Sequence, residues 1–401
     1  MSNSLLTIDM ITRKALEILE NNLVVTRTVN RQYDDSFAVE GAKIGSTLRI
    51  RKPDRALVTD GAALQVQDDN EQYTTLTVSS QKHIGVNFTS AELTMQLDDF
   101  ADRVLKPRIS QLASSIDADV ANAYKSIYQS VGTPGTTPAT SLVLLQAQQK
   151  LNEAAAISSP RYATVNPAAN AALVEGMKGL FNPVSTISKQ FKSGLMGEGI
   201  LGYEELGMSQ SIKQHTTGSR TGSISVKTTV TAEGTTAVTL NGTTGNTLTV
   251  GDVFTIGSVY SVNPQTREST GSLQQFVVTA ANTAASSTFT DVAISPAIYT
   301  SAHALATVDS FPQANATVTV LGSASTQYAQ NLIYHKDAIT FATADLLLPQ
   351  GVDMASRQVH NGISLRVVRQ YDINNDRLPC RIDVLYGYGV IRPEMAVRLW
   401  G

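Results

Sequence analysis

Charged residues are scarce in this chain. Asp, Glu, Lys and Arg make up 16% of its 401 residues, against about 25% in an average soluble domain. The 31 basic and 34 acidic residues leave a net charge of −3, so the chain lacks the basic field with which proteins hold nucleic acid. This balance argues against sequence-specific DNA binding.

Residues that carry catalysis or bind metals are also few. The single cysteine, Cys380, excludes an intrachain disulfide and a multi-cysteine metal site, and we expect it to be a small packed residue of a strand. The five histidines are isolated from one another, and the chain contains no HExxH, GxSxG or GxxxxGK[S/T] motif. No catalytic set can be assembled from these residues, and the sequence predicts neither a metal nor a cofactor.

Long apolar runs are absent as well. No stretch of about 18 apolar residues occurs, and the N-terminal segment carries Asp9, Glu17 and Glu20 where a signal peptide would be apolar. We therefore expect neither secretion nor membrane insertion. Since 42% of the residues are hydrophobic, the length predicts two to three folded domains at roughly 150 residues each.

The N-terminal quarter combines a helix, an arm and a hairpin. Apolar residues recur at helical spacing over residues 5–21, and residues 24–37 have no clear period and indicate an extended arm. Alternation over residues 45–51 predicts a strand, with its partner at residues 72–88. The stretch between them is polar and too long for a tight turn. These features indicate a long, poorly buried hairpin, which is stable chiefly when another molecule covers it.

Helices dominate the next hundred residues. A long helix is predicted from Pro107 to Tyr128, and a Gly- and Pro-rich loop at residues 132–138 ends it. Further on, the pattern predicts a helix at 141–157, a strand at 161–165 and a helix at 167–180. This order is typical of an α/β region.

The composition changes abruptly at Thr216 and returns to its earlier character after Gly322. Between Gly271 and Val308 the only charged residue is Asp291. Short β-type segments separated by Gly, Asn or Ser turns are typical of a small barrel or sandwich. A flexible Ser/Thr linker is the alternative, but recurring valines and phenylalanines favour a folded, inserted β domain. Beyond it, strands are predicted at 331–334, 338–342, 363–371 and 380–388.

Two segments imitate ligand sites. Gly197 to Gly202 matches a dinucleotide fingerprint, but no strand precedes it and no acid follows at the required distance. Asp372, Asn374 and Asp376 match a calcium loop in which Arg377 replaces the required glycine. We interpret both segments as ordinary loops.

The C-terminal segment resembles that of a known family. Cys380-Arg-Ile382, then Tyr386-Gly387, then Arg392-Pro-Glu394 are similar to the closing segment of the P-twenty-two-type coat proteins of short-tailed bacteriophages. The layout of the whole chain resembles these proteins too.

The resemblance implies an α+β fold of the Hong-Kong-ninety-seven type, that of tailed-phage capsids. Its parts are an N-arm, an extended β-hairpin loop, a long spine helix, peripheral and axial domains and an inserted, barrel-like all-β domain. Carried over, they are residues 1–41 (N-terminal helix and arm), 42–86 (extended loop), 87–139 and 351–401 (peripheral domain), 140–215 and 323–350 (axial domain) and 216–322 (inserted domain).

The function implied is that of a major capsid protein without catalytic activity, located in the virion and assembled in the host bacterial cytoplasm. The expected partners are copies of itself in hexamers and pentamers, a separate scaffolding protein, a portal protein at one vertex, a decoration protein, and double-stranded DNA contacted non-specifically. Two other hypotheses stay open: a nucleotide-binding enzyme built on Gly197 to Gly202, and an exported adhesin-like β protein.

Four cations lie within seven positions of the predicted hairpin: Arg49, Arg51, Lys52 and Arg55. Because like charges repel on an isolated hairpin, we expect them to bind acidic residues of neighbouring subunits. A solvated face explains the same composition equally well.

Overall fold

The computed structural model describes residues 8–34, 47–53, 55–56, 61–62, 66, 72–88, 101–177, 197–374 and 377–401. Its contacts divide the chain into two compact units. The first consists of residues 1–50, 73–120 and 339–389, and the second of residues 51–72, 121–338 and 390–401.

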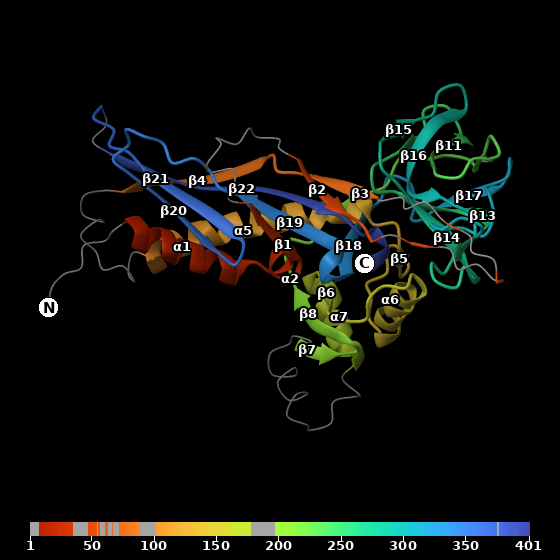
Figure 1. Cartoon of the computed structure of the whole chain (residues 1–401), viewed down its shortest axis with the longest axis horizontal. Coiled ribbons are helices and arrows are strands. Elements are labelled where there is room, and N and C mark those ends of the chain that lie inside the picture. The colour runs from red at the N-terminus through yellow and green to blue at the C-terminus, as the bar shows by residue number, and fades with distance from the viewer. Residues whose placement is uncertain are drawn as a thin grey trace. The chain divides into compact units, whose positions relative to one another are not determined.

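The first unit is a mixed sheet with helices (Figure 1). Its strands pair in the order β1-β19-β22-β21-β20, with β4 also on β22, and α1 packs against β20 and β21. Buried residues at helical spacing, Ile11, Ala15 and Leu19 among them, form the packed face of α1. The elements are α1 (Ile8–Asn22), α2 (Val25–Thr28), β1 (Asn30–Asp34), β2 (Thr47–Arg51), β3 (Tyr73–Thr77), β4 (Ser80–Phe88), a π-turn (Ala101–Leu105), α5 (Lys106–Ala121), β19 (Ile339–Ala344), β20 (Met354–His360), β21 (Ile363–Arg369) and β22 (Leu378–Val390).

The second unit contains another mixed sheet, in the order β5-β23-β18-β6-β8-β7, with β9 also on β18. From Gln330 to its end at His335, β18 is fully buried, which places it in the core of this unit. The elements are the 3-10 turn η3 (Asn122–Ser126), β5 (Ser130–Val131), α6 (Ser141–Glu153), β6 (Arg161–Val165), α7 (Pro167–Met177), β7 (Gly197–Ile200), β8 (Tyr203–Met208), β9 (Gln214–Thr216), β18 (Gln327–His335), η5 (Lys336–Ala338), η6 (Pro393–Met395) and β23 (Ala396–Trp400).

The same unit carries a closed six-stranded barrel, in green to teal in Figure 1. Phe254, Phe276 and Phe289 are fully buried inside it, among the valines and isoleucines of its strands. The predicted α+β fold with an inserted β barrel is thereby confirmed. The barrel strands are β10 (Ile224–Val226), β11 (Thr235–Asn241), β13 (Val253–Val262), β14 (Ser269–Val278), β16 (Thr288–Ile298) and β17 (Thr317–Val320), with β12 (Thr247–Leu248) and β15 (Asn282–Thr283) as a separate pair.

The predicted hairpin differs from the structure. The segment at residues 72–88 is two strands: β3 pairs with β2, whereas β4 pairs with β22 of the large sheet. The described base of the hairpin is also not poorly buried, because Leu76 and Val78 pack with Ala342, Ala344 and Leu385. Burial against its own chain stabilises this base, and the remainder of the predicted hairpin lies outside the described residues.

Two further segments depart from the sequence prediction. The long helix ends at Ala121, seven residues early, and tightens into η3, because Asn122, Tyr124 and Ser126 favour a helix less than Ala does. The predicted N-terminal arm contains the helical turn α2 and then β1, which pairs in parallel with β19. Strand β19 belongs to this sheet, and residues 339–344 lie in the first unit.

The barrel should fold by itself. Residues 216–322, expressed separately, should give a β-type circular dichroism spectrum and a cooperative melting transition, because the barrel closes on its own core and about 100 residues suffice without metals or disulfides. A disordered spectrum without a transition would show that this segment depends on the rest of the chain.

Candidate functional site

The segment that carries the family resemblance lies in β22, inside the large sheet. Asp383 is fully buried there and accepts hydrogen bonds from Arg366 Nη2 and Arg381 Nε, each at 2.6 Å. Cys380, three residues earlier in β22, is buried as expected, and burial raises the pKa of its thiol to about 12. This part of the segment is built for packing, since its only thiol is held protonated.

The Tyr-Gly pair of the same segment has a steric cause. A Cβ atom on Gly387 would lie 2.3 Å from the carbonyl oxygen of Thr77, the last residue of β3. The hydroxyl of Tyr386 donates to Asp119 of α5 at 2.5 Å, and Lys82 of β4 lies 2.6 Å from the same carboxylate. The pair thus lets the base of the hairpin and helix α5 close on β22.

The four predicted contact residues have different surroundings. Arg49 is exposed, and its guanidinium carbon lies 4.7 Å from the ring centroid of Tyr73 on β3. Arg51 is exposed. Lys52 is half-buried, and its backbone N–H donates a hydrogen bond to the Gln72 carbonyl oxygen. Arg55 already faces an acid of its own chain, with Nη2 at 3.8 Å from Glu394 Oε1. The structure therefore brings Lys52 and Arg55 together, in the second unit, and leaves Arg49 and Arg51 on the surface.

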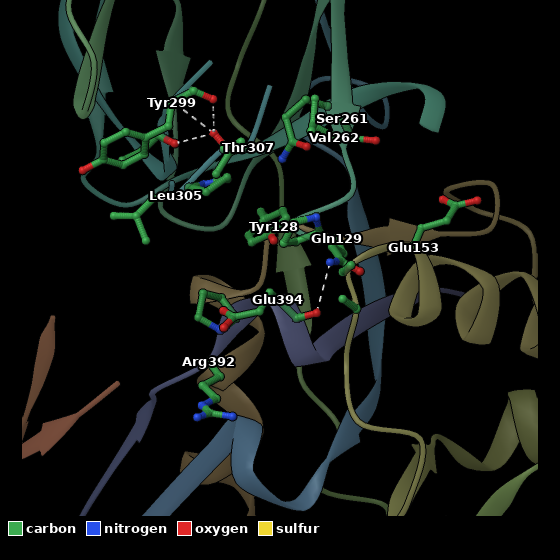
Figure 2. Close-up of a pocket in the computed structure, with 18 of the residues that line it drawn as sticks. Tyr128, Gln129, Glu153, Ser261, Val262, Tyr299, Leu305, Thr307, Arg392 and Glu394 are labelled. Atoms are coloured by element: carbon green, nitrogen blue, oxygen red, sulfur yellow. Dashed lines mark hydrogen bonds between the residues drawn. The ribbon is translucent and has the colours of Figure 1, made fainter. Parts of the chain in front are cut away.

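Lys52 and Arg55 line a cavity of about 660 Å³ within the second unit. Its walls come from the base of the hairpin, the end of α6, the barrel strands β13, β14 and β16, and the turn η6. Figure 2 shows Tyr299, Leu305 and Thr307 of the barrel on one side and Glu394 on the other. The side-chain amide of Gln129 donates a hydrogen bond to the backbone carbonyl oxygen of Glu394 at 3.2 Å.

Lys150 is the most perturbed cation of this cavity. It follows the buried positions Leu144 and Ala147 of α6 at helical spacing, so its stem lies beside the packed face of the helix. Its ammonium donates to Gln275 Oε1 of the barrel at 2.9 Å. Burial lowers the pKa of Lys150 to about 8. Sequence reasoning missed this residue, although its place beside the apolar positions was the available signal.

Lys150 gives a pH prediction. Because its pKa is depressed from 10.5 to about 8, the unfolded chain binds more protons between these values, and stability should rise with pH across this window. Lys150→Met should raise the melting temperature at pH 7 and lose that advantage above pH 10. Differential scanning calorimetry against pH measures it, and an advantage that is equal at both pH values would contradict the assignment.

The barrel is joined to the rest of the second unit by polar contacts of buried and half-buried groups. The side chain of Gln275 mimics a strand: its Oε1 accepts from the Ser130 amide at 2.7 Å and its Nε2 donates to the Ser130 carbonyl at 3.1 Å. His215 Nε2 lies 2.9 Å from Asp252 Oδ1. Arg398 is fully buried beside Tyr124 and donates to the Gly251 carbonyl at 2.8 Å, and burial lowers its pKa. Buried groups held in this way fix the orientation of the barrel within the unit.

The two segments that imitate ligand sites have the structure of hairpins. Residues 197–202 belong to the antiparallel pair β7–β8, and a fingerprint would require a strand followed by a helix. Asp372 and Asn374 lie in the connection from β21 to β22, while Asp376 lies outside the described residues. In the described part of the chain, no cluster of three His, Cys, Asp or Glu could hold a metal ion. Within the same ranges, none of the helices has the length and apolar composition needed to cross a membrane.

A family model described as "P22 coat protein - gene protein 5" matches residues 1–401. Among solved structures, "Mycobacterium phage Che8" is similar at 10% identity and a TM-score of 0.42, over 94% of this chain and 90% of that one. The "asymmetric unit of bacteriophage PhiM1 mature capsid" is similar at 10% identity and a TM-score of 0.44, over 94% and 86%. The "capsid of Ralstonia phage GP4" gives 8% identity and 0.42, over 100% and 93%. No curated protein matches this sequence.

Proposed function

The chain belongs to the P22 coat protein family, and on that premise we propose that it is the major capsid protein that forms the hexamers and pentamers of an icosahedral phage head enclosing double-stranded DNA. The observation that carries the proposal is the family match over the whole chain. The role is structural, without catalysis. Assembly takes place in the host bacterial cytoplasm, and the product is the virion capsid.

The partners follow from that role. The chain binds copies of itself, a separate scaffolding protein during assembly, a portal protein at one vertex and a decoration protein on the shell. Packaged DNA is contacted non-specifically, which agrees with a net charge of −3, because a strongly basic lining would immobilise the DNA.

The parts of the chain take the roles of the family's domains. Residues 1–41 are the N-arm, 42–86 the extended loop, 87–139 and 351–401 the peripheral domain, 140–215 and 323–350 the axial domain, and 216–322 the inserted domain. The hydrogen bonds of Gln275 to Ser130 support a steadying role for the inserted barrel.

Co-expression with the scaffolding protein of the same phage tests the proposal. Sedimentation velocity should then show large, uniform particles, whereas the chain without the scaffold should yield smaller species or irregular assemblies. A chain that stays monomeric under both conditions would contradict the proposal.

Arg49 and Arg51 supply the contact between subunits that this function requires. Both are exposed at the described base of the extended loop, where acidic residues of a neighbour can reach them. Replacing both by alanine should change the stability of the unassembled chain by about 1 kcal/mol or less, since exposed cation–π contacts contribute little, and should strongly reduce the yield of closed shells.

A matched control removes two exposed cations elsewhere, with Lys125→Ala and Lys227→Ala. This variant should assemble as the unaltered chain does. Electron microscopy with particle counting measures both, and a normal shell yield from the Arg49/Arg51 variant would overturn the proposed contact.

A further inference from the structure

The cavity of the second unit carries an excess of positive charge. Among the residues that the structure describes, its walls hold two acids, Glu153 and Glu394, and five cations, although the chain as a whole has a net charge of −3. The cations come from the base of the hairpin, α6, the barrel and the turn η6: Lys52, Arg55, Lys150, Arg267 and Arg392.

The two acids do not neutralise this excess. Glu394 faces Arg55 at 3.8 Å, and the charge of Glu153 opposes the lowering of the Lys150 pKa by burial without cancelling it. Counted over the described wall residues alone, five positive and two negative charges leave three positive charges over. Partly buried cations are stabilised by a counter-charge, so the described walls favour an anion as the occupant of the cavity.

Two buried polar atoms of the wall lack partners as well. Arg267 donates from Nη2 to the Ala56 carbonyl at 3.4 Å, but its Nε is buried without a hydrogen-bond partner among the described residues. The Oε1 atom of Gln129 is also buried without a hydrogen-bond partner among the described residues. Buried donors and acceptors are nearly always satisfied, so these two atoms are exceptions in the wall of the cavity.

The size and the remaining walls fit a small molecule. A volume of about 660 Å³ lies within the range of small-ligand sites, roughly 300–1,000 Å³. Apolar surface is also present, from Tyr128, Tyr299 and Leu305.

We propose that this cavity binds one small oligophosphate anion, whose oxygens accept hydrogen bonds from Lys150, Arg267 and Arg392. Phosphate oxygens suit the planar donors of arginine, and an oligophosphate concentrates three or more negative charges in a volume where a peptide segment would place about one. Because its ligands come from α6, the barrel and η6, beside the hairpin base that carries Lys52, the anion ties these segments together. This role is independent of catalysis and of shell formation.

Calorimetric titration of the unassembled full-length chain with inorganic tripolyphosphate tests the proposal. One anion should bind per chain and raise the melting temperature. Lys150→Met and Arg267→Gln should each weaken binding about tenfold or more, whereas Lys125→Met, which removes an exposed cation outside the cavity, should not. Near pH 8, titrations in buffers of different ionisation enthalpy should show proton uptake, which the Lys150→Met variant should lose.

A parallel titration with ATP distinguishes the sources of the phosphate. Tighter binding of ATP than of tripolyphosphate assigns a nucleotide, with its base on the apolar wall, and equal or weaker binding assigns a free oligophosphate. The proposal is overturned if neither anion binds, if binding is unchanged in both cavity variants, or if an oligoglutamate peptide binds more tightly than either anion.

Discussion

Replacing Asp117 by alanine is expected to lower the free energy of unfolding of the first unit by about 3–5 kcal/mol, since every buried donor left without an acceptor costs about 1–3 kcal/mol. Asp117 is a buried residue of α5. Its carboxylate accepts from the amides of Val24, Val25 and Thr26 at 2.6, 3.4 and 2.9 Å, and from the Thr26 hydroxyl at 2.6 Å.

These four bonds hold the start of α2 against α5. The first N–H groups of a helix have no partner within it, and α2 has no side-chain cap of its own. Asp117 caps the start of α2 instead, although it lies 91 to 93 positions away in the sequence. Burial raises the pKa of Asp117, while the hydrogen bonds from Thr26 and from the backbone oppose that shift.

Urea unfolding measures the effect, with Glu17→Ala as the control. Glu17 is an exposed acid of α1 that pairs with Lys14 at 3.2 Å, and its loss should cost about 0.5 kcal/mol or less. If Asp117→Ala and Glu17→Ala unfold at the same urea concentration, α2 does not depend on Asp117.

Gly387→Ala is expected to cost about 3 kcal/mol, because overpacking forces backbone to move. The added Cβ would lie 2.3 Å from the Thr77 carbonyl oxygen and 2.9 Å from the Val78 Cα atom. Both obstacles are backbone atoms, so no side-chain rotation can relieve the clash. Either the turn between β3 and β4 must leave β22, or β22 must bend.

Gly85→Ala is the matched control for this variant. Gly85 lies on β4, paired with Arg381 of the same strand β22, and nothing lies within 4 Å of its added Cβ. Thermal melting should place Gly85→Ala near the unaltered chain and Gly387→Ala well below it. Equal melting temperatures would refute the steric account of the Tyr-Gly pair.

Local patterns were enough to predict many elements. The predicted strand at 161–165 corresponds to β6, and the Asn166-Pro167 start of the following helix corresponds to α7, with Asn166 Oδ1 accepting from the Ala169 amide at 2.8 Å. The change in composition at Thr216 and Gly322 located the barrel, because an inserted domain has its own core.

Long-range pairing was beyond these patterns. Nothing local indicates that Asn30–Asp34 pairs with β19, about 310 residues later, or that β4 leaves its hairpin for β22. Such contacts depend on the burial of whole strand faces, and alternation within one strand does not specify its partner.

The sequence likewise revealed some residues of the candidate site but not their surroundings. The cations of the hairpin could be found in the sequence because they lie within seven positions, but their surroundings could not. Arg55 faces Glu394, and Lys150 donates a hydrogen bond to Gln275. In both pairs the partners are more than 100 residues apart in the sequence. The cavity exists only after four distant parts of the chain have folded together.

A cryo-electron microscopy reconstruction of particles formed with the scaffolding protein tests the central claim most directly. The account predicts closed icosahedral shells with pentamers at the vertices, hexamers between them, and one chain with the inserted barrel in every subunit position. Particles without icosahedral symmetry, or shells whose subunit density cannot hold the large sheet, helix α5 and the barrel, would contradict it.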